Sequence, residues 1–213
     1  MNWISDHSNA LNFITNLGML FIWIVYLQLF LITYLRSRKP RIIINRSYGS
    51  DVDAICIVSN MSQEPVYTQN IYCTIHHQNG TCAAAITDRE ILQESGRDQR
   101  PDGVTSQGPL NQGEFVSMGT FKNMLAVTSE RSKEFPDGID NLAGKIDTME
   151  IMVISAFGGD DLEIAATREF RIDTSVTPWK VIPIGPATKQ ISSRKERKKI
   201  RQMVIDNLNN DQI

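Results

Sequence analysis

The run from Leu17 to Leu35 contains no charged residue, and it constrains the fold of this chain more than any other feature. As an α-helix it would span about 28 Å at ~1.5 Å per residue, close to the ~30 Å hydrocarbon core of a bilayer. Residues 11–16 can extend the helix, and Trp3 and Tyr34 suit the two interfacial regions. We therefore expect residues 1–10 to form a short N-terminal segment and residues 11–35 to form a transmembrane helix.

Two other interpretations of this run are a secretory signal peptide and the core helix of a soluble domain. A signal peptide has a basic segment before its apolar run and small residues at its cleavage site. Here the preceding segment, MNWISDHSNA, contains no Lys or Arg, and the sequence SRKPR follows the run. A buried core helix rarely shows such a long stretch without a charged residue. We therefore expect a retained, single-pass helix.

A basic collar at residues 36–41 sets the expected orientation of this helix. It consists of Arg36, Arg38, Lys39 and Arg41, whereas no basic residue precedes the apolar run. Cytoplasmic flanks of membrane helices carry the excess of Lys and Arg. The chain is thus expected in a cell (inner or plasma) membrane, with the N-terminus outside and the C-terminal domain in the cytoplasm.

The charges of the remaining chain are unevenly distributed. Residues 42–190 hold 20 acidic and 12 basic side chains, while residues 192–213 hold six basic side chains and three acidic ones. An acidic domain therefore lies between two basic flanks. Such asymmetry points to a membrane face or a partner protein. It does not favour nucleic acid, because the acidic domain would repel the phosphate backbone.

Residues 42–187 have the patterns of an antiparallel β domain. Short β-branched or alternating runs separated by turns predict strands; they occupy residues 41–45, 52–60, 66–88, 149–157, 162–173 and 179–185. We expect a mainly β fold, an immunoglobulin-like antiparallel β-sandwich with an irregular middle insertion at residues 94–145. A small β-barrel is the alternative.

The hairpin within residues 66–88 bears on metal binding. Asn79-Gly80 is a strong two-residue turn signal, and pairing around it places Cys73, Cys82 and His77 on one apolar face. His76 would then point to the opposite face, and Cys73 and Cys82 would lie about 13 Å apart. We expect neither a metal site nor a disulfide here, and no cofactor. Three cysteines in all, with Cys56 the third, fit a reducing compartment.

Residues 188–213 are predicted to form a basic amphipathic helix, with Ser193 and Glu196 at capping-box spacing. Its first turns place cations at the positive end of the helix dipole, which is locally unfavourable. This indicates that the charges serve an interaction with something outside the helix. A membrane surface or a partner is expected there, and a solvated basic helix is the alternative. The candidate contact residues are Arg194, Lys195, Arg197, Lys198 and Lys199, with an apolar stripe of Ile200, Met203, Val204 and Leu208.

The expected function is that of a binding protein. A single-pass anchor would present a cytoplasmic β-sandwich as an interaction or scaffold module, with membrane lipids and another protein, or a second copy, as partners. One alternative is an enzyme whose site lies in the irregular region and uses Asp98, Arg100, Asp102 and Glu114. Another is an accessory subunit of an oligomeric membrane complex. In that case Asn16 and Gln28 would bond across a helix pair.

Overall fold

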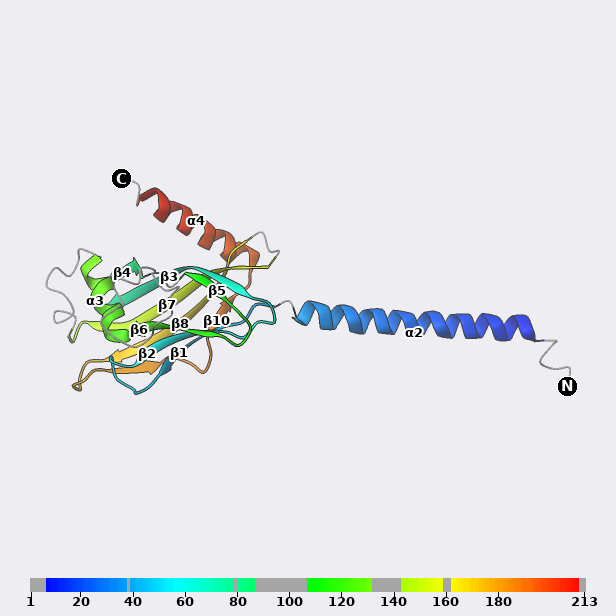
Figure 1. Cartoon of the computed structure of the whole chain (residues 1–213), viewed down its shortest axis with the longest axis horizontal. Helices are drawn as coiled ribbons and strands as arrows, with labels where there is room; N and C mark the ends of the chain where they lie inside the picture. Colours follow the sequence, from blue (N-terminus) through cyan, green and yellow to red (C-terminus); the bar gives the residue numbers. More distant parts are fainter. Residues whose placement is uncertain are drawn as a thin grey trace. The chain divides into compact units, whose positions relative to one another are not determined.

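The computed structural model describes residues 7–37, 39–78, 80–86, 107–131, 143–158 and 162–210. It divides into two compact units, Met1–Lys39 and Pro40–Ile213. The chain is mainly β, with two antiparallel sheets, an apolar N-terminal helix and a C-terminal helix, as the sequence predicts (Figure 1).

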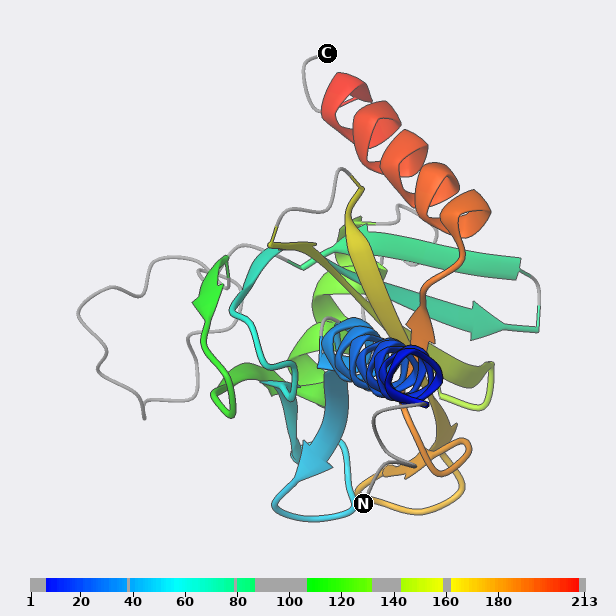
Figure 2. The same cartoon turned by 90° about the vertical axis from the view of Figure 1, so that its right-hand side faces the viewer.

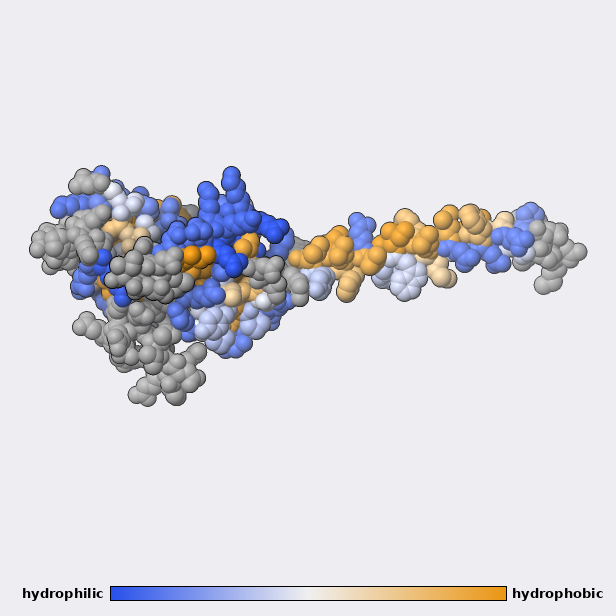
Figure 3. All heavy atoms as spheres, turned by 90° about the horizontal axis from the view of Figure 1, so that it is seen from above, coloured by the Kyte–Doolittle hydropathy of each residue, from blue (hydrophilic) through white to orange (hydrophobic). Residues whose placement is uncertain are grey.

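The first unit is the helix α2, Ser8–Ser37. Within it, Ser8–Leu35 is long and apolar enough to cross a membrane, with a mean hydropathy of 2.0 and no residue buried. Apolar side chains cover most of the helix surface (Figure 3). The helix ends before Pro40, because the residue before a proline is pushed out of helical conformation.

The second unit contains two sheets. The three-stranded sheet has the order β1-β2-β6, and the seven-stranded sheet has the order β10-β8-β7-β3-β4, with β5 paired to β3 and β9 paired to β8. The first sheet comprises β1 Ile42–Ser47, β2 Ile55–Asn60 and β6 Phe115–Thr120. The second comprises β3 Val66–His77, β4 Gly80–Ala85, β5 Gly108–Leu110, β7 Ile146–Phe157, β8 Ile164–Asp173, β9 Lys180–Pro183 and β10 Lys189–Ile191.

One apolar core lies between the sheets. Side chains alternate along β2, so that every second residue is buried against the facing sheet. In β3 the residues Ile71, Cys73 and Ile75 enter this core, whereas Tyr72 is buried on the outer face. The helix α3, Phe121–Arg131, follows β6 directly and adds Phe121, Met124 and Leu125 to this core. The Phe121 ring meets Phe170 of β8 edge to face, with 4.8 Å between centroids.

The β3–β4 hairpin has a different register from the one predicted around Asn79-Gly80. His77 pairs with Gly80 and Ile75 with Cys82, so residues 78–79 make the connection. A shift of two residues leaves each side chain on its predicted face. Cys73 and Cys82 are accordingly both buried in the core.

The free edge of β1 is closed by side chains from the end of the domain. Thr188 Oγ1 accepts a hydrogen bond from Ile44 N at 2.9 Å, and Gln190 Oε1 accepts one from Ile42 N at 3.1 Å. Buried Arg168 of β8 donates to the Ile44 carbonyl at 2.8 Å. These bonds satisfy an edge strand that would otherwise be open to another chain.

The helix α4, Arg194–Asn210, covers part of the outer face of the seven-stranded sheet. Ile200 is buried against Tyr72, Ile154 and Ala165, and Met203 and Val204 pack beside it. The Arg197 guanidinium donates to the carbonyls of Leu162 and Glu163, the first at close range and the second at 2.8 Å. The helix is thus held at its first turns as well as along its apolar face.

Asn60, fully buried at the end of β2, joins the segments that meet at one end of the domain. Its Nδ2 donates to the carbonyls of Glu64 at 3.0 Å and Leu110 at 2.8 Å, and its Oδ1 accepts from Ser62 N at 2.8 Å. Its main chain also bonds to Gly113 and Glu114.

We predict that Asn60→Ala lowers the free energy of unfolding by about 2–4 kcal/mol, because two buried backbone groups, Leu110 O and Ser62 N, and the half-buried Glu64 O lose their partner. Asn45→Ala is the matched control, since the Asn45 side chain is exposed and accepts a local hydrogen bond from the neighbouring Arg46 N. Urea unfolding of the full chain in detergent, followed by near-ultraviolet circular dichroism, measures both. Equal stability of the two variants would contradict this role of Asn60.

Candidate functional site

Cys73, His76, His77 and Cys82 lie on the paired strands β3 and β4. Among the residues that the structure describes, no group of three or more His, Cys, Asp or Glu could hold a metal ion. None of the three cysteines is part of a disulfide, and all three are buried. Burial raises the pKa of the Cys73 thiol to about 12, and it raises the pKa of Cys56 even further. Both thiols are therefore held neutral and away from solvent.

We predict that none of the three cysteines reacts with iodoacetamide in the folded chain at pH 8. Burial shields all three thiols, and the raised pKa of Cys56 and Cys73 also suppresses the thiolate, which is the reactive form. Intact-mass measurement should detect no adduct in native detergent solution and three adducts after denaturation. Rapid modification of the native chain would mean that the core around Cys73 opens readily.

The residues expected for an enzyme site are only partly described. Asp98, Arg100 and Asp102 lie outside the described residues. Glu114 accepts a hydrogen bond from Asn111 N at 2.9 Å, and its carbonyl accepts one from Asn60 N. Glu114 therefore closes the turn that leads into β6. The described part of the predicted insertion forms regular structure, namely β5, β6 and α3.

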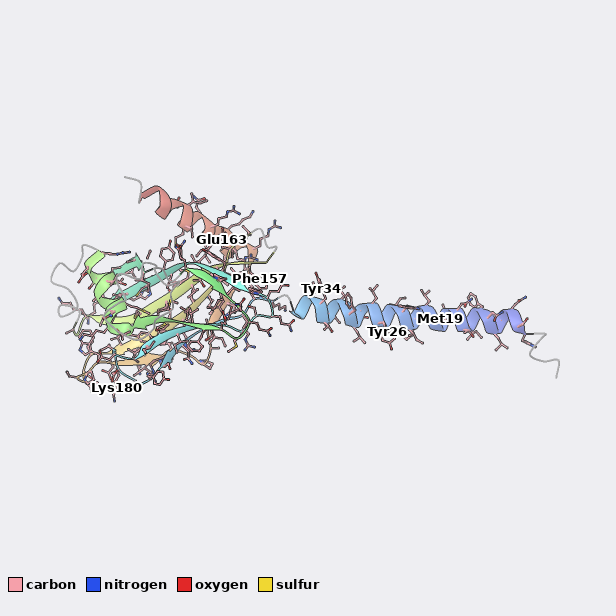
Figure 4. The ribbon with its side chains drawn as sticks, in the orientation of Figure 1. Met19, Tyr26, Tyr34, Phe157, Glu163 and Lys180 are labelled. Carbon is pink, nitrogen blue, oxygen red and sulfur yellow. The ribbon has the colours of Figure 1, made fainter. Side chains whose placement is uncertain are left out.

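An open groove lies between α4 and the start of β3, with a volume of about 400 Å³. Glu163 and Arg201 contribute charged groups to it, and Figure 4 labels Glu163 near α4. The β3–β7 register shifts between Thr68 and Asn70, beside the groove. Its described lining consists of Tyr67, Gln69, Asn70, Gln107, Glu163, Arg201, Val204 and Ile205. These groups suit hydrogen bonding and ion pairing, and none of them is a thiol or an imidazole.

Two of the collar residues are described in full. Lys39 and Arg41 are exposed, and the Arg41 main chain bonds to Ser62 and Met61 at 2.8 Å each. Arg38 and the side chain of Arg36 lie outside the described residues. Arg41 is thereby attached to the loop that follows β2.

The predicted contact residues of the C-terminal helix divide between two faces. The side chains of Arg194, Lys195, Lys198 and Lys199 are exposed, whereas Arg197 bonds to the domain. Ile200, Met203 and Val204 pack on the domain's own sheet, and the Leu208 side chain is not described. The cations are therefore the part of this helix that remains available to lipid or protein. The sequence signal for this packing is the run at 149–157, which also carries apolar residues, Met152 and Ile154, on the face of the sheet that points away from the core.

Asn16 and Gln28 are both exposed on α2. Twelve helical positions separate them, which places them about 18 Å apart along the axis and roughly 120° apart around it. They therefore do not share one face, and each would meet a partner on a different side.

Comparison with protein families, with curated proteins and with solved structures finds no match to this chain. The function is therefore inferred from this chain's own residues and their arrangement.

Proposed function

We propose that this protein is a single-pass membrane protein that presents a cytoplasmic β-sandwich as an interaction module. The observation that carries the proposal is α2, whose Ser8–Leu35 segment is apolar on all sides and buried nowhere. A helix that is apolar all round is stable when protein or lipid surrounds it, and the helix forms its own compact unit.

The proposed orientation places the N-terminus outside. The four basic residues of the collar lie in the last turn of α2 and directly after it, and no Lys or Arg precedes the helix. Positive flanks resist translocation. Three buried cysteines, none of them in a disulfide, also suit a domain in a reducing compartment.

An immunoglobulin-like sandwich is the proposed class of the domain. The order β1-β2-β6 corresponds to strands A, B and E of such a domain, and the order β4-β3-β7-β8 corresponds to C′, C, F and G. The disulfide that is a hallmark of antibody domains is missing, since none of the three cysteines forms a disulfide. Domains of this architecture commonly act by presenting surfaces and loops, which supports a binding role by analogy of fold.

We predict that protease cleaves the β domain and a C-terminal tag in inside-out vesicles, and leaves both intact in sealed right-side-out vesicles. Immunoblotting of the tag measures the protected fraction. Cleavage in right-side-out vesicles would place the domain outside the cell and refute the proposed orientation.

The basic collar provides a second test of orientation. Arg36, Arg38, Lys39 and Arg41 changed together to Gln should yield a mixed orientation, because they lie directly beside the helix. The matched control changes Arg194, Lys195, Lys198 and Lys199 to Gln. These lie far beyond the ~15–20 residues over which flanking charge acts, so orientation should stay uniform. An equal effect of both variants would remove the collar as the determinant.

A subunit of an oligomeric membrane complex is the second candidate. It is favoured by Asn16 and Gln28, whose amides are exposed on α2 and would lack partners in hydrocarbon. Chemical crosslinking in membranes should then give oligomers that Asn16→Leu and Gln28→Leu weaken. Thr15→Val is a suitable control, because the Thr15 hydroxyl already bonds to the Leu11 carbonyl at 2.9 Å.

A further inference from the structure

We propose that one end of the β domain rests on the anionic surface of the bilayer, an inference that depends on the proposed membrane anchoring. The docking face consists of Arg41, Met61, Tyr67 and Phe115 together with Arg194, Lys195 and Lys198 of α4. Three of these are large apolar side chains that stay exposed. The exposed fraction is 52% for Met61, 48% for Tyr67 and 58% for Phe115.

The strand registers bring Met61 and Phe115 together. Arg41 precedes β1, and its carbonyl accepts a hydrogen bond from Met61 N at 2.8 Å. Ile42 pairs with Asn60, and Ser59 pairs with Phe115. The first residue of the domain, the loop after β2 and the start of β6 therefore meet at one end of the domain, which faces the viewer in Figure 2.

The first turns of α4 belong to the same end. Phe157 at the end of β7 pairs with Val66 at the start of β3. Gly158 follows, and a Cβ there would lie 2.7 Å from a carboxylate oxygen of Glu64, in the loop after β2. Arg197 then attaches α4 to Leu162 and Glu163 at the other side of this hairpin. Figure 4 labels Phe157 and Glu163 at this end and Lys180 at the opposite end.

Anionic lipid is the occupant that these side chains fit best. Exposed aromatic and thioether groups beside Arg and Lys match the interfacial region, where rings sit at headgroup level and cations meet phosphate. The chain itself favours this occupant, because only residues 38–41 join α2 to β1. At ~3.4 Å per residue that linker reaches on the order of 15 Å.

A competing role exists for the α4 cations. Asp160 and Asp161 stand between β7 and β8 in sequence, outside the described residues, next to the segment that Arg197 binds. If Arg194, Lys195 and Lys198 serve only to pair with these acids, their reversal would lower stability and leave membrane contact unchanged.

The test uses the full chain in nanodiscs of neutral lipid and of lipid containing phosphatidylglycerol. A fluorophore on Gln63→Cys reports on the docking face and one on Asp53→Cys on the opposite end, while the native cysteines are buried. Spin-labelled headgroups should quench the first label strongly in anionic nanodiscs and the second weakly. The quenching should persist when ten Gly and Ser residues are inserted after Lys39, because contact and not only tethering holds the face down.

Charge and apolar variants have matched controls. Arg194→Glu, Lys195→Glu and Lys198→Glu together, or Met61→Ser with Phe115→Ser, should reduce the quenching to the level of the Asp53 label. Reversal of Lys122, Lys145 and Lys180, and Tyr48→Ser, should leave it unchanged, because these exposed residues lie at the other end. Thermal unfolding of each variant shows whether the domain is intact.

Several results would overturn the proposal. One is equal quenching of the Gln63 label in both lipids. Another is quenching that persists in the charge and apolar variants. A third is quenching that disappears when the linker is lengthened. Charge reversal that only lowers the unfolding temperature would assign the cations to Asp160 and Asp161. Failure of the chain to enter either nanodisc would instead refute the membrane anchor of the proposed function.

Discussion

Asn60 is the residue on which the organisation of the β domain depends most directly. It is buried, and its amide bonds to three main-chain groups in segments that approach from β2, β3 and β5. A buried amide is stable only when these partners are all in place, so it selects one arrangement of the loops around it. The two sheets share their apolar core, but the core alone would tolerate small shifts of these loops.

Local sequence patterns could predict the elements but not their long-range closure. The runs at 52–60, 149–157 and 162–173 alternate or are continuously apolar, and strands form there. The short strand β10 was not predicted, because residues 189–191 have no strand-like period. The side chains of Gln190 and Thr188 bond to Ile42 and Ile44, which lie 148 and 144 positions earlier in the chain. No local sequence pattern encodes such a contact.

The candidate site shows the same division. The basic collar and the cations of the C-terminal helix could be identified from charge alone. The sequence does not say which surface the apolar stripe of this helix packs against. The structure shows that this surface is the domain's own sheet. The exposure of Met61 and Phe115 on one face could not be predicted from the sequence, because they are 54 positions apart and only strand pairing brings them together.

The closure of β1 has a consequence for the order of events during synthesis. Ile42 and Gln190 are 148 positions apart in the chain, so the edge of β1 cannot be satisfied until nearly the whole domain has been made. Contacts of such long sequence separation form late and slowly. The apolar helix therefore leaves the ribosome well before the domain can complete its fold. If the membrane-insertion machinery captures that helix, β1 lies beside the bilayer before Thr188 and Gln190, the partners of its edge, have been synthesised. During this interval the edge of β1 is open to pairing with another chain.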